Sequence, residues 1–342
     1  MSPSNQQSGS QPVDTDMVRI RGILGDWERS FTNSQPLPDT KRVVADWLFR
    51  ELFHLQDVGN DPQYGAIEIE GKIGTLFHKE SGQRCDFPVM NTVILNPRQC
   101  EQYRFESRMQ EVRPLAPLPT NSPPKLTTAL QTEHSHMNQA LNDHLRRSME
   151  EPGRVKLHYK HFTDVDSFAT LSPAGLAALP ASVRDRLDPR HHHPKLRTTT
   201  RHEKGRKPHV AARIVKVNVA NLHIYSPNDP YDLRISINVE VNLERPDLHH
   251  EDLIVLPSDP EGEKDPQPDR KKDRISYNHL CYQIDLTRVD VIKQRPKYEL
   301  EIEVDAEVLR GQMELGKHGA FGDVVAGFWD DAVTLMREKP PM

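Results

Sequence analysis

Apolar and polar residues alternate along much of the chain between residues 64 and 304. Because successive side chains of a β-strand point to opposite faces, this period of two predicts strands that each carry one apolar and one polar face. Most of these strands follow one another through short links, which favours an antiparallel sheet closed, or nearly closed, into a barrel over a doubly wound sheet. The expected strands are residues 64–76, 92–95, 155–159, 162–168, 196–200, 211–219, 222–225, 232–243, 275–277, 281–291 and 298–304.

Helical spacing of apolar residues occurs on both sides of this region and once within it. We expect helices within residues 39–59, 127–149 and 306–338, and the first and last of these would buttress the barrel. Segments rich in Pro, Gly and charged residues are expected to be surface loops. They lie near residues 110–125, 171–195 and 257–270.

The start of the chain differs in composition from the rest. Residues 1–15 are mostly Ser, Gln, Pro and Gly, which cannot bury enough apolar area to offset their chain entropy, so we expect a disordered tail. Residues 16–338 are then expected to form a single domain of the α+β class that is mainly β.

Bulk charge and cysteine content exclude several classes of protein. The formal net charge of −5 argues against a protein that coats nucleic acid by broad electrostatic attraction, so any contact with RNA must be local. The three cysteines, Cys85, Cys100 and Cys281, lack the close spacing of zinc ligands or of a disulfide framework. No apolar run approaches the roughly 20 residues that span a bilayer, so we expect a soluble, intracellular protein with no membrane contact.

Two strands carry an unusual acidic face. In IEIEGKIG, residues 67–74, Glu68, Glu70 and Lys72 share one face and isoleucines share the other. In ELEIEVD, residues 299–305, four acids share one face. A sheet whose ionic face lies in water explains one such strand. Two strands that carry like charges at every second position instead indicate hard oxygen ligands that hold a divalent metal ion.

Strands between the two acidic ones carry cations at alternating positions. Lys216 lies between two valines, and Arg197 and Arg201 are expected on the same face of their strand. Residues 270–274 place three more cations at spacing two. If these faces point inward, the barrel encloses many charges, and burying ions without partners is costly. Such a lumen would need internal ion pairs, a metal ion and a polyanionic ligand, and a triphosphate meets that demand.

Several motifs occur in a fixed order from about Gly65 to Asp305, namely IEIEGKIG, DVDSF, ARIVKVN, YSPNDPYDLRISINVE, KDRISY, QIDLT and ELEIEVD. This ordered set resembles the fungal and protozoal RNA 5′-triphosphatases of mRNA capping, which are triphosphate tunnel metalloenzymes. The resemblance implies a closed antiparallel barrel of eight strands. It also implies a nuclear enzyme that hydrolyses the γ-phosphate of 5′-triphosphate RNA and leaves a 5′-diphosphate end, the first step of cap formation.

The resemblance further implies roles for individual residues. The carboxylates that would hold Mg²⁺ or Mn²⁺ are Glu68, Glu70, Glu301 and Glu303. The cations that would contact phosphate oxygens are Arg197, Lys216, Lys272 and Arg274. Glu240 matches the residue that orients the attacking water. Positions that contact the substrate or support these residues are Lys72, Asp166, Arg234, Arg270, Asp285, Thr287 and Glu299.

Some alternatives stay open at this point. The stretch between Asp166 and Arg197 is longer than the family pattern, so Arg201 is the fallback for the phosphate-binding arginine. The mRNA guanylyltransferase, the capping enzyme alpha subunit, is a partner inferred from the pathway, and a homodimer is a further option. Rival functions are hydrolysis of free nucleotide or tripolyphosphate, and a non-catalytic barrel that binds RNA ends as a scaffold. We assign no role to the run 191–193 of histidines, which lies in a predicted loop.

Overall fold

The computed structural model describes residues 15–28, 30–32, 39–58, 65–109, 133–187, 194–203, 205–255 and 268–338. The chain divides into two compact units, residues 1–39 and 40–342. The first unit contains helix α1 (Thr15–Leu24), which the sequence pattern did not predict. Residues 1–14 of the predicted tail lie outside the described residues.

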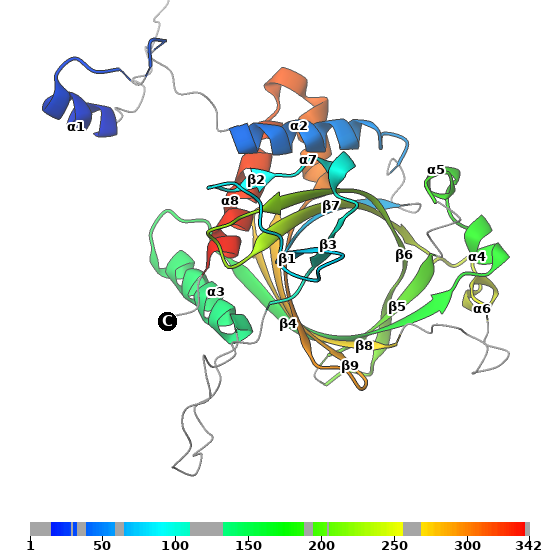
Figure 1. The fold of residues 1–342 in the computed structure, drawn as a ribbon. Helices are drawn as coiled ribbons and strands as arrows, with labels where there is room; N and C mark the ends of the chain where they lie inside the picture. The colour runs from blue at the N-terminus through cyan, green and yellow to red at the C-terminus, as the bar shows by residue number, and fades with distance from the viewer. Residues whose placement is uncertain are drawn as a thin grey trace, which may run out of the picture. The chain divides into compact units, whose positions relative to one another are not determined.

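The second unit is built around a closed antiparallel barrel of eight strands (Figure 1). The order around the barrel is β1, β10, β9, β8, β4, β5, β6 and β7, and β7 pairs with β1 to close it. The barrel strands are β1 (Ala66–His78), β4 (His158–Thr170), β5 (Lys195–His202), β6 (His209–Tyr225), β7 (Asp232–Asn242), β8 (Arg270–His279), β9 (Tyr282–Val291) and β10 (Lys297–Val304). Two short strands pair with its wall, β2 (Val93–Ile94) with β6 and β3 (Tyr103–Glu106) with β1. The predicted fold class is confirmed.

The hydrophobic core lies outside the barrel, between its wall and the surrounding helices. Ile69, Ile237 and Ile302, on three adjacent strands, have no exposed surface. They belong to the same apolar cluster as Leu48 and Phe328, which come from helices. Because side chains alternate across each strand, the residues between these isoleucines point into the lumen. The barrel therefore keeps its interior for polar groups.

Besides α1, the α-helices are α2 (Asp39–Phe53), α3 (Glu133–Glu150), α4 (Pro173–Ala177), α5 (Ala181–Arg184), α6 (His250–Leu253), α7 (Ala306–Glu314) and α8 (Phe321–Arg337), with 3-10 turns at Pro97–Gln99 and Gly316–His318. Helices cover the outer apolar surface of the barrel (Figure 1). Helices α2 and α8 contact each other through Phe49 and Phe321, whose rings meet edge to face with centroids 5.5 Å apart. Helix α3 is tied to β8 by the Tyr277 hydroxyl, which donates to Asn142 Oδ1 at 3.0 Å. None of the described helices is both long enough and apolar enough to cross a membrane.

Gly71, inside the acidic motif of β1, has a packing role on the outer face. A Cβ atom at this position would lie 3.0 Å from Ile302 Cγ2 and 3.3 Å from Phe328 Cζ. A larger residue would therefore push α8 away from the wall, although the neighbouring Glu70 and Lys72 point to the other side. The motif thus serves both faces of the strand.

Two strand predictions were wrong in detail. The segments 155–159 and 162–168 were expected as separate strands, but β4 is continuous from His158. The segments 211–219 and 222–225 are joined in β6, because a register shift between Asn218 and Ala220 leaves the pairing with β7 unbroken. Strand β3 and helix α6 were not predicted.

Part of the predicted surface loop at 171–195 is helical. Ser172 caps α4 by accepting from the Gly175 N–H at 3.0 Å, with a proline in the first turn, as is common at a helix start. Leu179, just before α5, and Val183, within α5, are buried in the core. The breaker residues in this segment therefore begin helices rather than exclude them. The predicted loop at 110–125 and residues 257–267 of the third loop lie outside the described residues.

Removing the aromatic ring of Phe328 should destabilise the barrel. Phe328 is 0% exposed, and a buried Phe→Ala change costs about 3–5 kcal/mol through lost burial and the cavity left behind. The Phe328→Ala midpoint in a urea titration should fall accordingly. The control is Phe31→Ala, a residue that is 99% exposed and whose loss should leave the midpoint unchanged. Equal midpoints for the two variants would contradict the position of the core.

Candidate functional site

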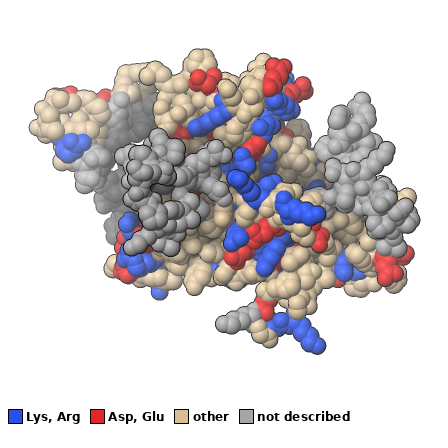
Figure 2. All heavy atoms as spheres, turned by 60° about the horizontal axis from the view of Figure 1, so that its bottom comes forward, with Lys and Arg blue, Asp and Glu red and all other residues tan. Residues whose placement is uncertain are grey.

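A cavity of about 910 Å³ occupies the barrel lumen. All of the predicted site residues line it except Asp285 and Thr287, which are buried on β9 behind the lining. On the face shown in Figure 2, Lys and Arg side chains lie intermixed with Asp and Glu near the centre of the view, without one broad basic surface. The charge of the site is therefore local, as the net charge of the chain requires.

Closure of the barrel brings the two acidic strands together. Glu70 on β1 is the register partner of Glu303 on β10, and Glu68 lies two residues away on the same face. Carboxylate oxygens of Glu68, Glu70 and Glu303 lie within 4.8 Å of one another. A second group, Asp285, Glu301 and Glu303, satisfies the same distance. The sequence prediction that these acids share one face and converge agrees with this geometry.

Glu68 and Glu303 are held in an environment that disfavours their charge. Burial, with repulsion from Glu68 and Asp285, raises the pKa of Glu303 to about 8. Burial also raises the pKa of Glu68, against the attraction of Lys216. A divalent cation among these oxygens would relieve both effects. The donors are carboxylates, with no thiol or imidazole in either group, and such hard ligands suit Mg²⁺ or Mn²⁺.

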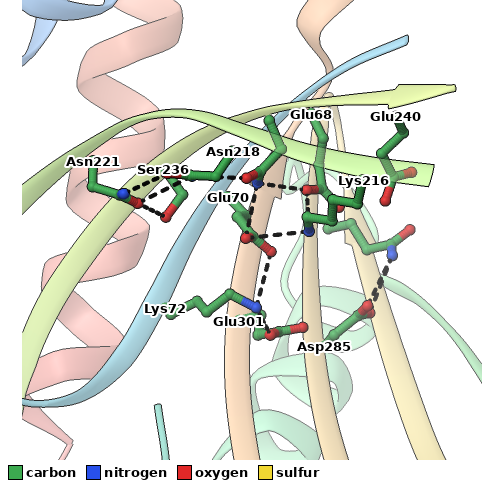
Figure 3. Close-up of polar contacts among 12 residues, drawn as sticks. Glu68, Glu70, Lys72, Lys216, Asn218, Asn221, Ser236, Glu240, Asp285 and Glu301 are labelled. Atoms are coloured by element: carbon green, nitrogen blue, oxygen red, sulfur yellow. Dashed lines mark hydrogen bonds and ion pairs between the residues drawn. The ribbon is translucent and has the colours of Figure 1, made fainter. Parts of the chain in front are cut away.

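Two lysines pair with the acids inside the lumen (Figure 3). Lys216 Nζ contacts Glu68 and lies 3.3 Å from Glu70 Oε1. Lys72 Nζ lies 3.1 Å from Glu70 Oε2 and contacts Glu301. Burial alone would lower the pKa of Lys72, but Glu301 and Glu70 outweigh it and raise that pKa above its usual range. Both lysines therefore stay charged.

A chain of amide and hydroxyl groups orients the metal-binding candidates (Figure 3). Asn238 Nδ2 donates to Glu68 Oε2 at 2.9 Å and to Glu70 Oε1 at 3.0 Å. Asn218 Nδ2 donates to Asn238 Oδ1 at 2.9 Å, so the Asn238 amide is held in one orientation. Asn221 donates to Asn218 in turn at 2.6 Å.

No role for these asparagines was predicted from the sequence. The alternation within β7 placed Asn238 on the polar face, but nothing local shows that it lies opposite Glu68 across the β1–β7 pairing. Asp164 was missed as well, although it stands two residues from Asp166 on the same face of β4.

Cations of the opposite wall pair with acids from neighbouring strands. Lys272 Nζ lies 2.7 Å from Asp166 Oδ2, and Arg274 Nη1 donates to Asp285 Oδ2 at 2.9 Å. Asp166 also accepts from the Thr199 hydroxyl at 2.7 Å. Burial alone would raise the pKa of Asp166, but Lys272 outweighs it and lowers that pKa. The acids thus fix where the cations point.

Three buried arginine donors around the lumen have no hydrogen-bond partner among the residues that the structure describes. They are the Nε atoms of Arg197, Arg234 and Arg274. Arg270 stacks on Phe168, with its guanidinium carbon 5.1 Å from the ring centroid. Because buried polar atoms are normally paired, unsatisfied guanidinium donors around the lumen fit an anionic ligand.

Arg197 and Arg201 both line the cavity but differ in how firmly they are held. Arg201 makes two hydrogen bonds to Asp164, at 3.0 and 3.1 Å, and its guanidinium carbon lies 4.3 Å from the Phe162 ring centroid. Among the residues that the structure describes, Arg197 has a single ionic contact, in which its Nη2 donates to Glu240 Oε1 at 3.3 Å. Arg197 is therefore the more available of the two for a ligand.

Comparison with known proteins agrees with this geometry. The sequence model of the family described as "mRNA capping enzyme, beta chain" matches residues 34–114 and 126–340. The mRNA-capping enzyme subunit beta of Schizosaccharomyces pombe is 31% identical over 319 residues, which is 91% of this chain and 85% of that protein. The Candida albicans subunit beta is 27% identical over 282 residues, 81% of this chain but only 44% of that protein.

Solved structures show the same relationship. The S. pombe Pct1 RNA triphosphatase in complex with the Spt5 CTD superposes with a TM-score of 0.62 and 29% identity, covering 92% of this chain and 100% of that one. The family predicted from the ordered motifs is confirmed, and the chain belongs to the family of mRNA capping enzyme beta chains, the RNA triphosphatases of mRNA capping.

Proposed function

We propose that this chain hydrolyses the γ-phosphate of 5′-triphosphate RNA, with Mg²⁺ or Mn²⁺, and leaves a 5′-diphosphate end for guanylyl transfer. The observation that carries the proposal is the meeting of Glu68, Glu70 and Glu303 within 4.8 Å in a lumen whose opposite wall is cationic. This arrangement suits a reaction that needs a bound cation and several fixed donors, and no nucleophilic side chain.

The metal ion would be held by Glu68, Glu70 and Glu303, with Glu301 beside them through its pairing with Lys72. When bound, the ion supplies positive charge to the phosphate oxygens and polarises the bond that breaks. Lys72 and Asn238 keep the carboxylates in place, because each contacts at least one of their oxygens.

The triphosphate would be bound by Arg197, Lys216, Lys272 and Arg274, which line the same cavity from different strands. Lys272 and Arg274 are aimed into the lumen by Asp166 and Asp285. Fixed cations stabilise the charge that spreads over the phosphoryl oxygens during transfer, and they cost no reorganisation at that moment. Lys72, Arg234, Arg270, Thr287 and Glu299 are proposed as their supporting residues.

Glu240 is the proposed residue that orients the attacking water. It lies on β7 as the register partner of Lys216, and its carboxylate faces the lumen near Glu68 (Figure 3). A carboxylate there can accept a hydrogen bond from water and direct its oxygen toward phosphorus in line with the leaving diphosphate.

The family membership places the chain in cap formation, and we propose that it acts in the nucleus beside the guanylyltransferase. The solved S. pombe Pct1 was bound to the Spt5 CTD, and we propose a similar peptide as a partner here. A homodimer stays a prediction.

Loss of a metal carboxylate should remove catalysis. Glu70→Ala and Glu303→Gln should each reduce phosphate release from triphosphate-ended RNA by about 10²-fold or more, in the range of other groups that stabilise transition-state charge. Glu150→Gln, on the exposed face of α3, is the control and should leave the rate unchanged. The same assay with tripolyphosphate separates an RNA enzyme from a general polyphosphate hydrolase. Full activity of both lumen variants with Mn²⁺ would contradict the proposal.

Metal binding should release protons near pH 7. A carboxyl with a pKa of about 8 is mostly protonated at that pH, and Glu303 must lose its proton to bind a cation. The apparent Mn²⁺ affinity should therefore rise as pH increases through 8. Calorimetry in two buffers of different ionisation enthalpy counts the protons. Glu303→Gln should reduce the release, and binding by the wild type without any proton release would count against the site.

Asn238→Ala should weaken Mn²⁺ binding by about 10–100-fold, because groups that orient metal ligands have effects of this size. The control is Asn242→Ala, at an exposed position of the same strand. Binding is measured by loss of the EPR signal of free Mn²⁺. Equal affinity of the two variants would show that the amide chain does not position the carboxylates.

A further inference from the structure

A second cavity, of about 470 Å³, reaches the acidic cluster from another side of the barrel. It is lined by the start of β1, the end of β10, the first turn of α7 and the turn between β8 and β9. Glu68, Glu240 and Glu303 line both this cavity and the lumen. The acidic cluster therefore lies between two spaces rather than at the closed end of one.

The two spaces differ in charge. The cations on the lumen lining are Lys72, Lys195, Arg197, Arg201, Lys216, Arg234, Arg270, Lys272 and Arg274. Among the described residues that line the second cavity, Arg310 is the one Lys or Arg, and its Nη1 donates to the Val58 carbonyl at 2.9 Å. The acids there are Glu68, Glu240, Glu303, Asp305 and Glu307. The lumen suits a polyanion, whereas the second cavity repels one.

We propose that the second cavity is the route by which the divalent cation reaches and leaves Glu68 and Glu303, separate from the path of the triphosphate. This inference rests on the proposed metal site. A cleft of one sign of charge raises the local concentration of its counter-ion and its association rate. A bound triphosphate would fill the basic lumen, but the second cavity would still give the cation access to the carboxylates.

The acids that line this cavity do not all have the same structural role. Asp305 caps α7, since its Oδ1 accepts from the backbone N–H groups of Glu307 and Val308 at 2.9 and 3.1 Å. Its presence is explained by the helix alone. Glu307 is exposed, lies in the first turn of α7 and lines the cavity. Glu307 is therefore the position at which charge can be changed without removing the cap.

The first test is reversal of this charge. Glu307→Lys should slow Mn²⁺ association about tenfold at low salt, measured by rapid mixing with a fluorescent Mn²⁺ indicator, and the difference should shrink as salt screens the field. Glu307→Gln should lie between this variant and the wild type. The matched control is Glu314→Lys, which makes the same charge change on the same helix but does not line the cavity. The KM for tripolyphosphate should not change in any of them.

The second test blocks the passage sterically. Cys281 lines the cavity and is partly exposed, whereas Cys85 is buried. In a Cys100→Ser background, a bulky neutral methanethiosulfonate adduct on Cys281 should slow both association and dissociation of Mn²⁺ and leave the dissociation constant unchanged. A route affects rates in both directions, whereas a binding residue affects the equilibrium.

These outcomes separate the two levels of the proposal. If the wild type binds no Mn²⁺, the proposed metal site itself fails. If the wild type binds Mn²⁺ through Glu303 but Glu307→Lys binds it as fast as Glu314→Lys does, only the route fails. Faster phosphate release by Glu307→Lys with unchanged Mn²⁺ kinetics would instead identify the second cavity as a product exit, and would overturn the inference.

Discussion

The mutual repulsion of buried carboxylates is the constraint on which this structure depends. Glu68, Glu70 and Glu303 lie together because β1 pairs with β10, and that pairing is also the one that closes the barrel. Their proximity costs free energy that has to be offset by lysines, by the Asn238 amide and, in the function that we propose, by a bound cation. The raised pKa of Glu303 shows that, without the metal, the protein groups offset it only in part. Binding of the proposed metal ion would therefore stabilise the site.

The apolar core lies outside the barrel, so the fold is stable although the lumen is lined by charged groups. The strand faces that carry Ile69, Ile237 and Ile302 pack against helices, so the opposite faces need not contribute to the core. Rigid strands then hold charged groups at fixed distances, which is what a reaction that depends on positioned charge requires. The helices buttress the wall without filling the lumen, and both spaces that reach the acidic cluster stay open to solvent.

The sequence predicted the faces of the strands better than the contacts between them. Alternation is a local property, so the acidic face of residues 67–74 could be predicted directly. The closed barrel of eight strands was predicted from the family resemblance of the ordered motifs. The hydrogen bonds of Asn238 depend on its register opposite Glu68, which no local pattern contains. The bulge in β6 interrupts the alternation of faces between Asn218 and Asn221, so a strict period of two predicts two strands where there is one. The helices near Leu179 depend on tertiary burial and were therefore mistaken for a loop.

We propose that one divalent ion is shared by carboxylates of β1 and β10, the first and last barrel strands along the chain. Crystals grown with Mn²⁺ and measured near the manganese absorption edge test it most directly. The account predicts an anomalous peak within coordination distance of Glu68, Glu70 and Glu303. A map with no peak there, or with manganese bound elsewhere and Lys216 still paired to the acids, would contradict it.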